Sequence, residues 1–197
     1  MKVSRAITAT LVFLAVLAAL YVLHVRHFTV DVVFYSALLD VAMAVLASSG
    51  VVLALRYFRV FNSFEICQLI AIWLLIGYAL AISLPTVIDR SLSFYILEKL
   101  EQRGGGIQMA RFEEVFTTEY VKEHRLVDVR LTEQQKSGTI TIRDGCVRLT
   151  PWGEKLVTFS RYFRLHLLPR KRLLLGEYSD DLTDPFRDSA ANKSYGC

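Results

Sequence analysis

Charged residues are scarce in the first part of the sequence. The 197-residue chain contains 23 Lys and Arg and 19 Asp and Glu residues, yet only eight of them precede residue 89. A soluble domain keeps such residues on its surface, so their absence excludes a water-exposed fold for this part of the chain. The abrupt change in composition near residue 89 indicates a boundary between lipid and water.

Cysteine and histidine are also rare, with three and four residues respectively. Cys67, Cys146 and Cys197 are odd in number and far apart, which indicates no disulfide framework and excludes the paired spacing of a zinc site. We interpret them as idle thiols. The chain also lacks the short motifs of serine hydrolases, zinc proteases, phosphate-binding loops and thioredoxin-like proteins. We therefore predict no catalytic, cofactor-binding or metal-binding residue, no cofactor and no small-molecule substrate.

Three long apolar runs fill the region 1–90. A helix needs about 20 apolar residues to cross a hydrocarbon core of about 30 Å. Runs of suitable length cover about 6–23, 32–55 and 66–88, and aromatic residues cluster at their ends, as is typical of the membrane interface. The sequence predicts a helical membrane region of three transmembrane helices.

The second and third runs carry faces of small and polar residues. Side chains four residues apart lie on one side of a helix, and small residues there let helices pack closely. A carboxylate near the middle of a span costs about 2.5–3.5 kcal/mol, so Asp40 must serve a purpose. It contacts this chain's own helices, meets a partner's transmembrane helices, or belongs to a proton relay. The predicted helix–helix interface consists of Ser36, Asp40, Ala44, Ser48, Gly77 and Ala81.

Beyond residue 90 the pattern changes to that of a small α+β domain. Apolar spacing of three and four predicts helices over about 91–103 and 108–116. After a turn-like Thr117-Thr118, a third helical region reaches to about Gln135 and is interrupted or bent near His124. The spacing then changes to two on either side of Asp144-Gly145, which predicts a β-hairpin. Pro151 begins another helix, and its apolar stripe is formed by Trp152, Leu156, Phe159 and Phe163.

The order of helix, helix, helix, hairpin and helix resembles the winged-helix fold over about residues 91–166. The resemblance is sharpest where the chain reads R-L-T-E-Q-Q-K-S-G-T-I-T-I, then D-G, then C-V-R-L-T-P-W-G. Gln134 or Gln135 departs from it, because an apolar residue is expected there. The resemblance implies a winged-helix-like domain at 91–168, fused to the membrane region, with an extended tail at 169–197.

Winged-helix domains can bind DNA through the third helix and the wing. Here that would use Arg125, Arg130, Arg143 and Arg148. The soluble part has nearly balanced charge, whereas binding to nucleic acid draws on several cations. Nucleic acid is therefore not our expected partner, and a protein-interaction role is preferred.

A second basic group lies along and after the last predicted helix. Basic residues next to an apolar helix face suit the surface of an anionic bilayer, so we predict contact with the lipid bilayer. The positive-inside count ties between the two sides, and the usual dominance of the first helix favours a C-terminal domain outside the cytoplasm. The basic group and the domain type favour a cytoplasmic C-terminal domain in a multi-pass protein of a bacterial inner membrane. The predicted contact residues are Arg161, Arg164, Arg170, Lys171 and Arg172.

These patterns favour a non-catalytic accessory or regulatory subunit of a membrane protein complex, with an integral membrane protein as partner. A membrane glycosyltransferase or a lipid-linked sugar pathway is one candidate client. A membrane-tethered winged-helix transcription regulator is the first alternative. A small lipid-phosphate enzyme at the bilayer surface, built around Asp89-Arg90, is the second.

Overall fold

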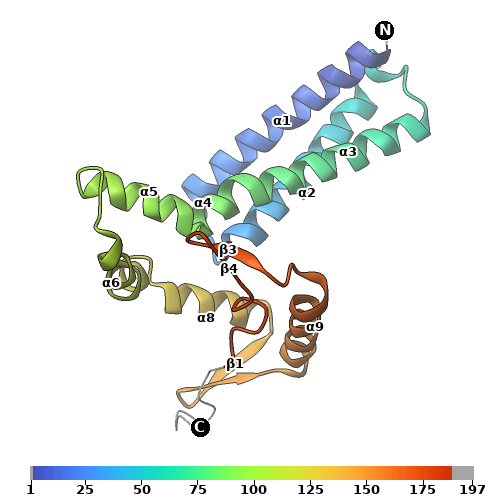
Figure 1. Ribbon diagram of the computed structural model, residues 1–197. Coiled ribbons are helices and arrows are strands. Elements are labelled where there is room, and N and C mark those ends of the chain that lie inside the picture. Colours follow the sequence, from blue (N-terminus) through green and yellow to red (C-terminus); the bar gives the residue numbers. More distant parts are fainter. Residues whose placement is uncertain (1, 188–197) are drawn as a thin grey trace. The chain divides into compact units, whose positions relative to one another are not determined.

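The computed structural model describes residues 2–187 of the chain, which are mostly helical (Figure 1). The chain forms two compact units. The first ends at Arg125 and the second begins at Leu126.

The first unit contains three helices that are long and apolar enough to cross a membrane, which confirms the three predicted spans. Helix α2 packs against both α1 and α3. The third span runs without interruption from α3 through a π-helical turn into α4 (Figure 1). The bounds are α1 (Lys2–His27), α2 (Val33–Ala54), η1 (Arg56–Phe58), α3 (Ser63–Ala81), η2 (Ile82–Thr86) and α4 (Val87–Arg90).

Pro85 accounts for the π-helical turn. Proline has no backbone N–H and its ring collides with the carbonyl one turn earlier, so a regular α-helical turn cannot form there. The Thr86 hydroxyl donates to the Ala81 carbonyl at 2.8 Å, an acceptor that Pro85 cannot satisfy because it has no N–H. The helix therefore continues beyond Pro85 and reaches Arg90.

The centre of the three-helix unit is held by three contacts. Phe13 of α1 stacks on Trp73 of α3 with 5.5 Å between ring centroids, and the Trp73 indole N–H donates to the Thr10 hydroxyl at 3.1 Å. Gly77 lies so close to α2 that a Cβ there would be 2.4 Å from the Val41 side chain. Small residues thus set the spacing of α2 and α3, as expected in a membrane.

Two further helical segments complete the first unit: α5 (Leu92–Gln102) and a continuous stretch from Met109 to Glu123. The predicted break at Thr117-Thr118 is wrong. Both hydroxyls donate to carbonyls one turn earlier, at Glu113 and Glu114, so these residues continue the helix. The stretch consists of η3 (Met109–Arg111), α6 (Phe112–Glu114), η4 (Val115–Tyr120) and α7 (Val121–Glu123).

The second unit begins with α8 and contains the predicted hairpin. Strands β1 and β2 pair antiparallel in the register Ile140↔Leu149. Asp144 and Gly145 both have positive φ, 52° and 73°, as a tight hairpin turn requires. The bounds are α8 (Leu126–Lys136), β1 (Ile140–Arg143), β2 (Cys146–Leu149), α9 (Pro151–Leu167), β3 (Arg172–Leu174) and β4 (Glu177–Ser179).

The L-T-P-W-G segment joins the hairpin to α9. The Thr150 hydroxyl accepts from the Gly153 N–H at 3.1 Å, which caps the helix. The same hydroxyl lies 2.7 Å from the Gly138 carbonyl and bonds it. A Cβ at Gly153 would lie 2.2 Å from the Thr139 carbonyl oxygen, so only glycine lets α9 approach β1 this closely.

The helix, helix, helix, hairpin, helix order occurs as expected, although the winged-helix fold itself stays a prediction. The division at Arg125 places α5 and the 109–123 stretch in the first unit and α8 to α9 in the second. The tail also departs from an extended segment, because β3 and β4 form a short hairpin within it. The predicted tail beyond 187 lies outside the described residues.

Candidate functional site

A hydrogen-bonded polar group joins α1 to α2 inside the apolar unit. His24 Nδ1 lies 2.7 Å from Asp40 Oδ1, and the Ser36 hydroxyl is 3.3 Å from the same ring. Asp40 is fully buried. From the sequence alone, His24 beside Arg26 would be placed on the surface at the membrane edge, and the contact with Asp40 shows that this interpretation is wrong. The signal that would have found it is the short connection between α1 and α2. His24 lies three residues before the end of α1 and Ser36 three residues after the start of α2, and Asp40 follows one helical turn after Ser36 on the same face.

The residues of the predicted helix–helix interface are mostly enclosed by protein. Asp40, Ala44 and Ser48 are fully buried, Ala81 is buried, Gly77 packs on Val41, and Ser36 is half-buried. Asp40 is thus engaged with this chain's own α1. Among the described residues, Asp40 Oδ2 and the Ser48 hydroxyl have no hydrogen-bond partner.

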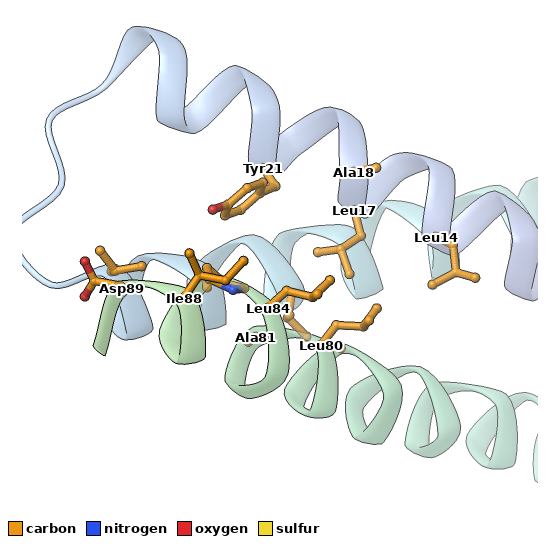
Figure 2. Close-up of a pocket in the computed structure, with 14 residues that line it drawn as sticks. Leu14, Leu17, Ala18, Tyr21, Leu80, Ala81, Leu84, Ile88 and Asp89 are labelled. Atoms are coloured by element: carbon orange, nitrogen blue, oxygen red, sulfur yellow. The ribbon is translucent and has the colours of Figure 1, made fainter. Parts of the chain in front are cut away.

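An apolar groove opens between α1 and α3, with α2 as its floor (Figure 2). Its volume is about 690 Å³, and we call it the membrane groove. In Figure 2, Leu17 and Tyr21 project from α1 towards Leu84 and Ile88. Asp89 is the one charged side chain among the described residues that line it. The lining consists of Leu14, Leu17, Ala18, Tyr21, Val33, Ala37, Val41, Gly77, Leu80, Ala81, Leu84, Pro85, Ile88 and Asp89.

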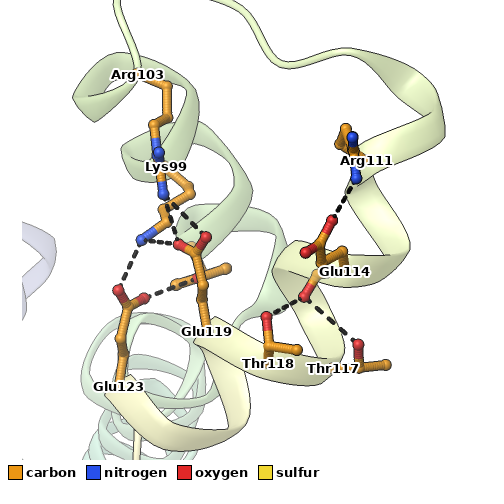
Figure 3. Close-up of polar contacts among 9 residues, drawn as sticks. Lys99, Arg103, Arg111, Glu114, Thr117, Thr118, Glu119 and Glu123 are labelled. Atoms are coloured by element: carbon orange, nitrogen blue, oxygen red, sulfur yellow. Dashed lines mark hydrogen bonds and ion pairs between the residues drawn. The ribbon is translucent and has the colours of Figure 1, made fainter.

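A second polar cluster fastens α5 to the 109–123 stretch (Figure 3). Lys99 is only 5% exposed, and its ammonium lies 2.7 Å from both Glu119 and Glu123. The Tyr95 hydroxyl donates to Glu123 at 2.9 Å, and Arg103 donates to Glu119. Sequence reasoning missed this cluster because it placed the apolar face of α5, not a lysine, inward.

The cluster shifts the ionisation of its members. The pKa values of Glu119 and Glu123 lie below the usual carboxyl value, chiefly because each accepts a hydrogen bond from Lys99. The same bonds raise the pKa of Lys99. Burial, followed by the bond to Glu123, raises the pKa of Tyr95. All of these charges are paired within the first unit, so the cluster acts as a structural clamp.

The apolar stripe of α9 is exposed. Trp152, Phe159 and Leu167 are 53%, 62% and 61% exposed, and Leu156 and Phe163 are also open to solvent. We call these five residues the α9 stripe. Gly153 is the only buried residue of α9, because the helix meets the hairpin through the side that carries this glycine. The predicted amphipathic helix is therefore present, and its apolar stripe faces outward from the second unit.

The predicted membrane-contact residues lie on different parts of the second unit. Arg161 and Arg164 line a cavity with Phe186, and the Arg164 guanidinium lies 5.8 Å from the centre of the Phe186 ring. The remaining three, Arg170 to Arg172, precede or begin β3. At about 100° per residue, Arg161 lies about 160° around α9 from Phe159. Arg161 therefore lies on the side of α9 opposite Phe159.

The four candidate nucleic-acid contacts are also distributed. Arg130 is paired with Glu133 at 2.8 Å. Arg143 and Arg148 lie on one face of the β1–β2 hairpin, since Arg148 is opposite Thr141 in the register. Arg125 belongs to the first unit. The hairpin thus presents two of the four arginines together.

One of the three cysteines does not fit the prediction of idle thiols. Cys146 is disulfide-bonded, so that interpretation is wrong there. Cys67 is free and exposed. Cys197 lies outside the described residues.

No protein-family model, curated protein or solved structure matches this chain.

Proposed function

We propose that this chain is a membrane-anchored accessory subunit of a membrane protein complex, and that the α9 stripe is the surface that binds its partner. The three spans hold the chain in the bilayer. The second unit then presents α9 to a neighbouring protein. The observation that carries the proposal is the exposure of five apolar side chains, two of them phenylalanine and one tryptophan, on one face of a helix.

An amphipathic helix in a globular domain normally turns its apolar face to the core. Exposed contiguous apolar patches mark interaction sites more often than chance surface. Aromatic side chains such as Trp152 and Phe159 are the residue types that dominate binding energy at protein interfaces. A groove on a partner that accepts an amphipathic helix is the recognition mode that fits this surface.

A protein partner fits the α9 stripe better than the bilayer surface. A helix that lies on a membrane combines its apolar face with basic side chains that reach the lipid headgroups. Arg161 and Arg164 instead line the cavity beside Phe186. The membrane anchor raises the local concentration of α9 around any partner in the same bilayer, so modest affinity suffices. A glycosyltransferase or another enzyme of lipid-linked sugars remains our candidate client.

Photo-cross-linking tests this proposal directly. A benzoylphenylalanine at Phe159, in tagged protein in native membranes, is expected to cross-link one integral membrane protein. The control places the same group at Thr158, one residue away, which lies outside the stripe. A second requirement is that Phe163→Ser removes the cross-link while Arg161→Ser retains it. Adducts to lipid alone, or equal adducts from both positions, would refute a protein docking surface.

The side of the membrane that the second unit faces also needs a measurement. The domain resemblance favours the cytoplasm, whereas the disulfide of Cys146 favours an oxidising compartment. A membrane-impermeant maleimide applied to intact cells, with and without a reductant, separates the two. Labelling of Cys146 only after reduction places the unit outside and removes the transcription-regulator alternative. Labelling only after lysis places the unit inside.

A further inference from the structure

We propose that the membrane groove binds one acyl chain of a bilayer phospholipid whose headgroup carries an ammonium, as in phosphatidylethanolamine. This site lies in the first unit and is independent of the α9 stripe. Its test can therefore fail while the docking proposal stands, and the reverse is also true.

The groove occupies one half of the membrane thickness. Its walls use the last part of α1, the first part of α2 and the last part of the third span, from Gly77 to Asp89. The C-terminal end of α1, the N-terminal end of α2 and the C-terminal end of α4 therefore mark the same side of the membrane. At 1.5 Å per residue, Gly77 to Asp89 spans about 18 Å, roughly half of a core about 30 Å thick. The groove thus matches one leaflet.

The inner end of the groove is closed at mid-membrane. Trp73 lies one helical turn before Gly77, and it joins α3 to α1 through the Phe13 stack and the Thr10 hydrogen bond. A transmembrane helix of a partner has a diameter of about 10 Å and crosses the whole core, so this closure would stop it halfway. A single acyl chain extends over one leaflet only and fits a site that is open at one end.

The chemistry of the groove changes from the inner end to the mouth. Leu14, Ala81 and Leu84 line it with hydrocarbon, whereas Tyr21 and Asp89 bring polar groups. Asp89 is exposed and lies next to the end of the third span at Arg90. A carboxylate at headgroup depth favours a nearby ammonium over a second anion. This charge selects the headgroup, while the apolar walls hold the chain.

Native mass spectrometry of the full chain, released gently from nanodiscs of equal phosphatidylethanolamine and phosphatidylglycerol, provides the test. We expect one retained phosphatidylethanolamine per protein. Ala18→Phe, which fills the groove, should reduce retention at least fivefold. Ala19→Phe is the matched control, because Ala19 is exposed but does not line the groove. Asp89→Asn should keep one lipid but abolish the preference between the two headgroups.

A second measurement does not depend on the stability of Ala18→Phe. In a Trp152→Phe background, Trp73 is the sole tryptophan and reports on the inner end of the groove. Phosphatidylethanolamine brominated near its chain terminus should quench Trp73 more strongly than the phosphatidylglycerol analogue, at least twofold at equal fraction. Equal quenching by the two lipids, no retained lipid, or a co-purifying transmembrane helix cross-linked at Leu84 would each overturn the proposal.

Discussion

His24 Nδ1 lies 2.7 Å from Asp40 Oδ1, which joins α1 to α2 by a polar contact within an otherwise apolar three-helix unit. Asp40 is fully buried, and His24 is its hydrogen-bond partner among the described residues. A buried carboxyl group is tolerated when its hydrogen-bond partner is present, but it lowers the stability of the fold when the partner is removed. The pair therefore fixes the contact between the first two spans.

Removing one member of this pair should cost more than removing both. His24→Ala leaves the Asp40 carboxyl buried without its partner and should lower the free energy of unfolding by about 2–4 kcal/mol. The double variant His24→Ala, Asp40→Ala removes the buried group as well and should recover at least half of that loss. Reversible unfolding in mixed micelles gives both values. Additive losses from the two substitutions would mean that the residues are not coupled.

Gly77 and Gly50 provide a matched pair of glycines within the spans. A Cβ at Gly77 meets Val41 at 2.4 Å, whereas one at Gly50 meets nothing within 4 Å. Gly77→Ala should therefore force α2 and α3 apart and lower the free energy of unfolding by about 1–3 kcal/mol. Gly50→Ala should be neutral or slightly stabilising, because alanine favours the helix. The same micelle unfolding measurement compares them, and equal effects would contradict the close contact.

The clamp around Lys99 should weaken in acid. The pKa values of Glu119 and Glu123 are lower in the folded chain than the ordinary 4.5. These carboxylates therefore stabilise the fold above that value, and their contribution is lost as the pH falls from about 4.5 through the lowered pKa values. Amide hydrogen exchange in α5 and in residues 115–123 should rise over this range while exchange in α9 does not.

Two variants separate the clamp from general acid unfolding. Lys99→Met removes the shared ammonium, so both carboxyl pKa values should rise towards the ordinary value and the acid transition should begin at higher pH. Arg111→Met removes an exposed pair with Glu114, which contributes little, and should leave the transition unchanged. If Lys99→Met and the parent chain open at the same pH, Lys99 is not the cause of the lowered carboxyl pKa values.

The sequence predicted those elements whose cause is local. Three apolar runs, the Asp144-Gly145 turn and the start of α9 at Pro151 each follow from residues adjacent in the chain, and the structure contains all of them. Asp40 also stood out correctly, because a carboxylate in a span needs a local reason. The sequence could not identify His24 as the partner of Asp40, because that contact depends on how α1 and α2 align.

The missed features depend on packing between segments. Lys99 reads as a solvent-facing residue of α5, and only the approach of Glu119 and Glu123 explains its burial. Thr117-Thr118 reads as a turn, but both hydroxyls find acceptors within the helix. An apolar helix face normally packs on a core, yet the short strands and the single buried glycine of α9 leave the α9 stripe uncovered. The membrane groove depends on the separation of α1 from α3, which no local pattern reports.

Gly153 should be the most sensitive position of the second unit. Its missing side chain lets the start of α9 lie against β1, where a Cβ would be 2.2 Å from the Thr139 carbonyl oxygen. That oxygen also accepts from the Thr150 N–H at 3.0 Å, so it cannot move without loss of the bond that closes the hairpin onto the helix. Gly153→Ala should therefore destabilise the second unit by about 1–3 kcal/mol. Limited proteolysis of the full chain should then cleave residues 126–187 at least fivefold faster, since cleavage follows the open population.

Gly106→Ala is the control, because a Cβ there meets nothing within 4 Å. Equal cleavage of the two variants would show that α9 does not need a glycine to pack on β1, and the physical reason given for the L-T-P-W-G segment would be lost with it.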